Sequence, residues 1–165
     1  MESVFSMKDV ILLPKDRRGV LNKEVCKKLK EELNVDCKVK DNAAELDGEG
    51  LELMTAKNIA KAIGRGFSPV RAYRLLDEDT QLEIFDMASF NDARIKAVKS
   101  RVIGTKGKTR HMIEECTGAA VSVYGKTISV IGEPEELKNA SKAIEMLING
   151  SEHKTVYRFL EQVRK

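Results

Sequence analysis

The chain has 165 residues, a length that suits one mid-sized domain or two small ones. Apolar residues make up 42% of it and charged residues 33%, so we expect a packed core under a heavily ionised surface. We expect no membrane span and no secretory signal, and three cysteines without a Cys-x-x-Cys spacing argue against a disulfide scaffold or a four-cysteine zinc site. A reducing cytoplasm fits this pattern best.

The net charge is only +3, but one segment carries the positive field. Between Ala93 and Ile113 there is no acidic residue. Seven basic residues lie in this window: Arg94, Lys96, Lys99, Arg101, Lys106, Lys108 and Arg110. Such a field attracts polyanions, and nucleic acid is the usual one. The alternative is a solvated helix face whose lysines cover apolar surface.

The first half of the chain predicts a small mixed domain. Alternation over 35–39 is typical of a strand, apolar spacing over 23–33 and 51–63 is typical of helices, and Ser68-Pro69 is typical of a helix start. In chain order we expect strand 10–13, helix 23–33, strands 35–39 and 43–46, helix 51–63 and helix 69–76.

The second half predicts a similar order with one more helix. Glycines interrupt two basic helices at 104–107, and a hairpin turns at Gly125-Lys126. In chain order we expect strand 82–87, helices 92–103 and 108–116, strands 119–124 and 127–131, helix 134–148 and a final helix 154–162.

A shift of 84 residues aligns the two halves without a gap from Leu29 onward. Gly48 falls on Gly132, and Tyr73-Arg74 falls on Tyr157-Arg158. We interpret this as a duplicated module of strand-helix-helix-strand-strand-helix with a trailing helix, against the alternative of chance. The expected domains are 1–80 and 81–165.

The segment from Gly104 to Gly107 has the properties of a phosphate clamp. Glycine at each end permits positive φ and lets a sugar-phosphate backbone approach. The amides that open the next helix lack intrahelical partners and favour an anion. Lys106, Lys108 and Arg110 add charge at the same point, while Ile103 and the following strand offer a shallow wall for bases.

This stretch resembles the KH domain family. Its members have Ile-Gly-x-x-Gly between two helices and then Thr-Gly-Ala with alternating apolar residues, as at 103–107 and 117–123 here. The resemblance implies an α+β fold of two tandem type I KH domains, each βααββα with a trailing helix, and a clamp on about four nucleotides of single-stranded nucleic acid. The residues expected to bind RNA are Arg101, Ile103, Gly104, Thr105, Lys106, Gly107, Lys108, Arg110, Val121, Ser122 and Val123.

The first copy departs from the family pattern. Its stretch 14–24 has no Gly-x-x-Gly, and its loop looks about two residues shorter. We expect a degenerate KH fold there, for packing, for protein contact, or as a weaker RNA surface through Lys15, Arg17 and Arg18.

A closer resemblance covers nearly the whole chain. The archaeal two-KH proteins, which are similar to the Krr-type and "partner of Nob" small-subunit assembly factors, share segments 61–69, 72–76, 107–110, 123–127, 131–132 and 153–160. The resemblance implies binding near the 3′ end of small-subunit ribosomal RNA during ribosome maturation. It also implies a Nob-type endonuclease or a translation initiation factor subunit as a protein partner.

Nothing in the sequence predicts catalysis, a metal or an organic cofactor. A P-loop around Gly107-Lys108-Thr109 would need glycine where Val102 stands, and the only two histidines are far apart. The rival interpretations are a small nuclease with its own metal site, a KH-fold interaction scaffold, and a general KH RNA-binding regulator unrelated to ribosomes.

Overall fold

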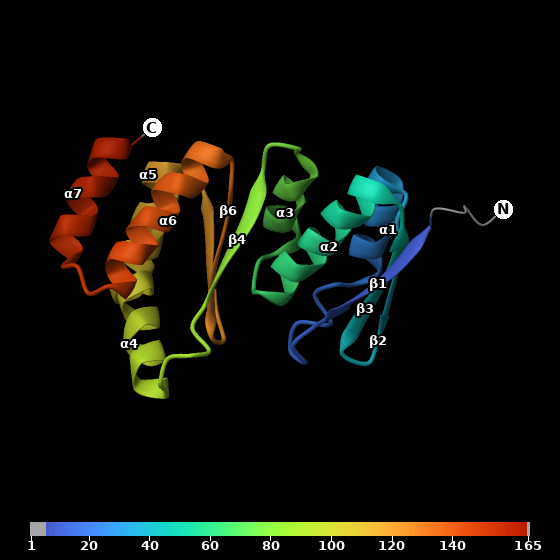
Figure 1. Cartoon of the computed structure of the whole chain (residues 1–165), viewed down its shortest axis with the longest axis horizontal. Helices are drawn as coiled ribbons and strands as arrows, with labels where there is room; N and C mark the ends of the chain where they lie inside the picture. Colours follow the sequence, from blue (N-terminus) through green and yellow to red (C-terminus); the bar gives the residue numbers. More distant parts are fainter. Residues whose placement is uncertain (1–5, 165) are drawn as a thin grey trace. The chain divides into compact units, whose positions relative to one another are not determined.

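The computed structural model describes residues 6–164, and the chain forms two compact units, Met1–Asp77 and Glu78–Lys165. No helix within the described residues is both long enough and apolar enough to span a membrane. The α+β class is confirmed, since each unit holds a three-stranded antiparallel sheet with helices on it (Figure 1).

The first unit has sheet order β1-β3-β2, and α1 and α2 lie on one side of that sheet (Figure 1). Its core includes the buried side chains of Leu29, Leu46, Ile59 and Ile63. The elements are β1 (Met7–Leu12), α1 (Lys23–Leu33), β2 (Asp36–Lys40), β3 (Ala43–Gly48), α2 (Gly50–Gly64), α3 (Pro69–Ala72) and the 3-10 helix η1 (Tyr73–Leu76).

The second unit has sheet order β4-β6-β5, with α4, α5 and α6 on that sheet, and α7 packs on the outer side of α5 and α6 (Figure 1). Val156 and Leu160 bury α7 in the same core as Ile113, Ile128 and Ile144. The elements are β4 (Gln81–Asp86), α4 (Asp92–Ile103), the 3-10 turn η2 (Thr105–Gly107), α5 (Lys108–Thr117), β5 (Ala120–Tyr124), β6 (Thr127–Gly132), α6 (Pro134–Ile148) and α7 (His153–Val163).

Local chemistry sets the ends of the helices that matter for the site. Helix α4 starts because the Asn91 side chain accepts a hydrogen bond from the Arg94 amide at 2.8 Å. Helix α5 ends at Gly118, which has φ 83° and donates its amide to the Glu114 carbonyl at 2.9 Å. The start of α4 and the end of α5 therefore both have a local cause, and the loop 104–107 lies between these two helices.

The duplication predicted from the sequence extends to backbone geometry. The bounds of β2, β3 and α2 shifted by 84 residues are those of β5, β6 and α6. The left-handed residues shift likewise, Asn34 onto Gly118 and Asp41 onto Gly125. Both units therefore repeat one chain path from the second strand onward.

A partly buried arginine contact repeats with the same offset. Arg17 donates from Nε to the carbonyl of Ile63 at 3.0 Å and from Nη2 to the carbonyl of Phe67 at 2.8 Å. In the second unit Arg101 donates from Nη1 to the carbonyl of Leu147 and from Nη2 to the carbonyl of Ser151. Each of the three positions in the first unit lies 84 residues before its counterpart, so a specific tertiary contact is part of the repeat.

The order of two helices after the first strand holds only in the second unit. Residues 15–20 form turns, so the first unit runs βαββα before its trailing helix. Four residues separate Leu12 from Arg17, whereas fourteen separate Asp86 from Arg101. Ten residues are thus missing before Arg17, and the four that remain leave no room for a counterpart of most of α4. From Arg17 to Asn34 the offset of 84 holds without a gap, so the loop itself is not shortened and its expected shortening by about two residues is wrong.

Candidate nucleic-acid interface

The loop 104–107 turns through three residues with positive φ. Gly104 has φ 76° and ψ 172°, Lys106 has φ 56°, and Gly107 has φ 75°. A Cβ on Gly104 would lie 2.3 Å from Thr109 Oγ1, whereas one on Gly107 would meet no atom within 4 Å. Gly104 thus lets the loop close against α5, and Thr105 and Lys106 lie exposed at its tip.

The start of α5 is open to an anion. No side chain caps it, and the residue before it is Gly107. In the first unit the matching helix α1 is capped, because Asn22 Oδ1 accepts from the Val25 amide at 3.1 Å. Since the positive end of the helix dipole points at the loop, the second unit can accept a phosphate where the first has already satisfied an amide.

The positive charge around this loop is not neutralised by the protein. Within residues 6–164, none of the seven basic side chains between Ala93 and Ile113 forms an ion pair with a carboxylate. Instead, Arg94 Cζ lies 3.7 Å from the centre of the Phe90 ring, and Lys108 Nζ lies 5.7 Å from the centre of the Tyr157 ring. The segment therefore presents a net positive field to solvent.

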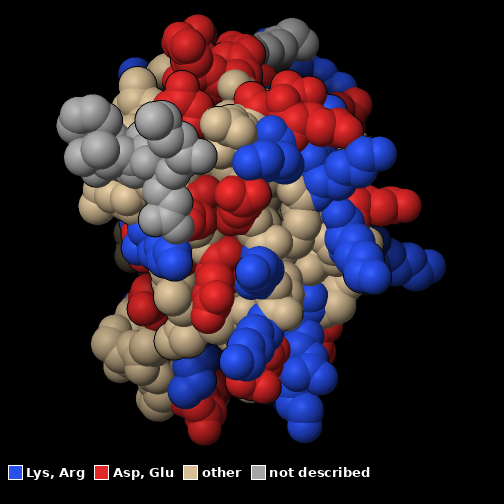
Figure 2. Space-filling view, turned by 90° about the vertical axis from the view of Figure 1, so that its right-hand side faces the viewer, with Lys and Arg blue, Asp and Glu red and all other residues tan. Residues whose placement is uncertain are grey.

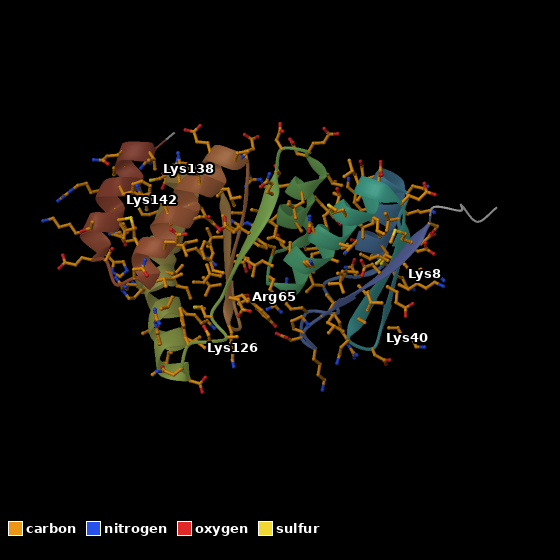
Figure 3. All side chains as sticks on the ribbon, viewed as in Figure 1. Lys8, Lys40, Arg65, Lys126, Lys138 and Lys142 are labelled. Atoms are coloured by element: carbon orange, nitrogen blue, oxygen red, sulfur yellow. The ribbon has the colours of Figure 1, made fainter. Side chains whose placement is uncertain are left out.

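A shallow basic groove runs along α4 beside the loop. It encloses about 320 Å³, and its lining is Asp92, Ile95, Lys96, Lys99, Ser100, Ile103 and Lys126. Lys126 comes from the hairpin tip between β5 and β6, where Figure 3 labels it. One wall is apolar through Ile95 and Ile103, and three lysines against one aspartate make the rim cationic.

The other predicted RNA-binding residues differ in how far they are exposed. Val121 is buried in the core and Val123 packs against it, so their side chains support the groove rather than line it. Ser122 is 8% exposed. The guanidinium of Arg101 is held by backbone carbonyls, while Arg110 is exposed on α5. The role of each of these residues in RNA binding stays a prediction.

Helix α7 supports the loop from the other side, which the sequence analysis missed. Tyr157 Oη lies 2.8 Å from Thr109 Oγ1, the atom that a Cβ added to Gly104 would meet. His153 Nε2 lies 3.0 Å from the Arg101 carbonyl oxygen. The first unit offers no signal for this contact, because the counterpart of Thr109 there is Val25. Only the folded arrangement brings α7 to the loop.

The sheet of the first unit carries charges of both signs. In its register Lys8 lies opposite Asp47 and Lys38 opposite Glu45. Figure 2 shows blue and red side chains interleaved over the visible face. This contrasts with the single-sign segment of the second unit. Across the described residues, 6–164, no group of three or more His, Cys, Asp or Glu is arranged to hold a metal ion.

Comparison with known proteins assigns the family. A family model for the second KH domain of PNO1, described as a eukaryotic type KH domain (KH-domain type I), matches residues 81–165. The chain belongs to the PNO1-type KH-domain family. The KH domain-containing protein MJ0443 of Methanocaldococcus jannaschii is 39% identical to this PNO1-type chain over 168 residues, covering 95% of this chain and 74% of that protein.

A fungal relative is more distant and longer. The pre-rRNA-processing protein pno1 of Aspergillus fumigatus is 30% identical over 141 residues, or 79% of this PNO1-type chain. The chain spans 56% of the length of that relative.

Two solved structures share the fold along nearly the whole chain. Dim2p from Pyrococcus horikoshii OT3 is 38% identical, with a TM-score of 0.87 and coverage of 94% of this PNO1-type chain and 99% of that one. The a/eIF2alpha-aDim2p-rRNA complex from the same organism contains a chain that is 38% identical, with a TM-score of 0.88 and coverage of 96% and 94%.

Proposed function

We propose that this protein binds single-stranded RNA through its second unit, near the 3′ end of small-subunit ribosomal RNA during ribosome maturation in the cytoplasm. The observation that carries the proposal is the glycine loop 104–107 at an uncapped helix start, set in a basic segment that forms no ion pair with any carboxylate of residues 6–164. The similar Dim2p chain solved together with rRNA supports the choice of RNA as the polyanion.

In this proposal the loop holds the phosphate backbone and the groove beside it receives bases. Gly104, Thr105, Lys106 and Gly107 contact the phosphates, while Lys108 and Arg110 add attraction. Ile103 provides the apolar surface on which a base lies, and Arg101, Val121, Ser122 and Val123 keep the loop and strand in place. The role needs no catalytic step, metal or cofactor.

We assign the first unit, residues 1–80 in the domain division proposed from the sequence, as a degenerate KH domain without a clamp. The assignment is supported by the shared path from the second strand onward and by the repeated arginine contact. Since Asn22 caps α1 and the glycines are absent, the unit offers packing or protein contact rather than phosphate binding. A translation initiation factor subunit, as in the Dim2p complex, or a Nob-type endonuclease is the proposed protein partner.

The test is a fluorescence-anisotropy titration of the full chain with RNA matching the small-subunit 3′ end, against a scrambled RNA of equal length. The double variant Thr105→Asp/Lys106→Asp should weaken binding by about tenfold or more, because two carboxylates would face the phosphates. Its thermal unfolding should match that of the unchanged protein, since both side chains are exposed.

The matched control is Lys15→Asp/Arg18→Asp, which reverses charge on the loop of the first unit and should retain affinity within about twofold. Normal binding by the Thr105→Asp/Lys106→Asp variant would refute the clamp. Equal affinity for both RNAs would favour a general KH regulator, and no binding to either would favour an interaction scaffold.

A further inference from the structure

Two thiols of the first unit face each other across the α1–β2 boundary. Cys26 Sγ lies 2.8 Å from Cys37 Sγ, and both side chains are half-buried. Cys26 lies in the first turns of α1, and Cys37 is the second residue of β2. The third cysteine, Cys116, is buried in the second unit and lies outside this pair.

We propose that Cys26 and Cys37 form a reversible intramolecular disulfide that ties α1 to β2. The sulfurs are already within reach of each other, so bond formation needs only a small adjustment of two side chains. Neither side chain is fully buried, so a small oxidant in solvent can reach the pair.

The pair belongs to the first unit alone. The positions 84 residues later are Arg110 and Val121, so the second unit has no counterpart of either thiol. The disulfide would also hold a strand at the edge of the sheet. Strand β2 is an edge strand that pairs only with β3, and a covalent link to α1 would give it a second attachment.

The two thiols have different roles in the exchange. The hydrogen bond from Cys37 stabilises the Cys26 thiolate and lowers the pKa of Cys26. The same hydrogen bond and burial raise the pKa of Cys37. Cys26 is therefore the attacking thiolate and Cys37 the resolving thiol.

The oxidant is a low-molecular-weight disulfide. The Cys26 thiolate attacks one of its sulfurs, forms a mixed disulfide and releases one thiolate. Cys37 then loses its proton, attacks Cys26 Sγ and releases the second thiolate. In total two cysteine thiols are oxidised by two electrons, and one small disulfide is reduced to two small thiols.

The test uses the full chain, incubated with oxidised glutathione or with dithiothreitol. Oxidation should lower the intact mass by two hydrogen atoms, leave one thiol that reacts after unfolding, and give a linked peptide pair containing Cys26 and Cys37. Cys116→Ser should still form the bond, whereas Cys26→Ser and Cys37→Ser should not. Three free thiols after oxidation, or a bond that involves Cys116, would overturn the proposal.

A second measurement tests whether the disulfide stabilises the first unit. The bond restricts the unfolded chain, and because the loop that it closes is short, the gain in stability is moderate. Oxidation should therefore raise the melting temperature of the unchanged protein by roughly 5–10 °C. Cys37→Ser should show no such dependence on the oxidant. A disulfide that forms without raising the melting temperature would overturn the claim that it stabilises the first unit. RNA affinity should be the same in both redox states, because the clamp lies in the other unit.

Discussion

Gly104 is the residue on which the proposed clamp depends most. Its φ of 76° and ψ of 172° fall in a region that is essentially restricted to glycine. An added Cβ would also lie 2.7 Å from the Thr109 amide nitrogen. We therefore expect Gly104→Ala to destabilise the second unit by about 2–5 kcal/mol, combining backbone strain with overpacking. Urea unfolding of the full chain measures this loss.

Gly107 provides the matched control for that substitution. Its φ of 75° and ψ of 13° are left-handed helical values, which asparagine tolerates, and the space beyond it is open. Gly107→Asn should cost about 1 kcal/mol or less. Equal losses for the two variants would show that the loop does not distinguish its glycines as described.

At the scale of elements, α7 is a support for the loop rather than a trailing appendage. Tyr157→Phe would remove the hydroxyl that contacts Thr109 Oγ1 and keep the ring beneath Lys108. We expect a loss of about 1 kcal/mol in unfolding free energy and a fall of up to about fivefold in RNA affinity. Thermal unfolding and anisotropy titration measure the two effects separately.

The repeat supplies the comparison for this variant. Tyr73 is the counterpart of Tyr157 in the first unit, so Tyr73→Phe makes the same chemical change away from the clamp. Its RNA affinity should be unchanged. If both variants bound RNA equally, α7 would be a packing element only.

The elements also show what sequence patterns could and could not predict. Helix α4 has the predicted bounds, because Asn91 and Gly104 mark both ends and apolar residues keep helical spacing between them. The single helix between the first two strands of the first unit agrees with the elements expected from its sequence. The order βααββα, which the repeat and the resemblance implied for both units, was wrong for the first unit, because ten residues are missing before Arg17. The offset of 84 already pairs Arg17 with Arg101 in the sequence. Only the structure shows why both positions hold arginine, since each side chain donates to backbone carbonyls at equivalent positions. The contact between Tyr157 and Thr109 is tertiary and has no sequence signal.

At the scale of the whole molecule, charge is divided unevenly. The segment from Ala93 to Ile113 carries seven basic and no acidic residues, although the net charge of the chain is only +3. The remainder is therefore net acidic. Such a distribution attracts RNA to one segment and repels it elsewhere, so binding should depend on salt through few contacts.

A clamp on about four nucleotides predicts a plot of log K against log salt with a slope of about −2 to −3, because each neutralised phosphate of a single strand contributes about −0.7. Lys99→Gln and Lys126→Gln, both in the groove beside the loop, should each make the slope shallower by up to about 0.7. Lys8→Gln and Lys40→Gln remove the same charge from the sheet of the first unit, labelled in Figure 3, and should leave the slope unchanged. A slope that responded equally to all four variants would mean that RNA follows the total charge of the molecule and not the groove.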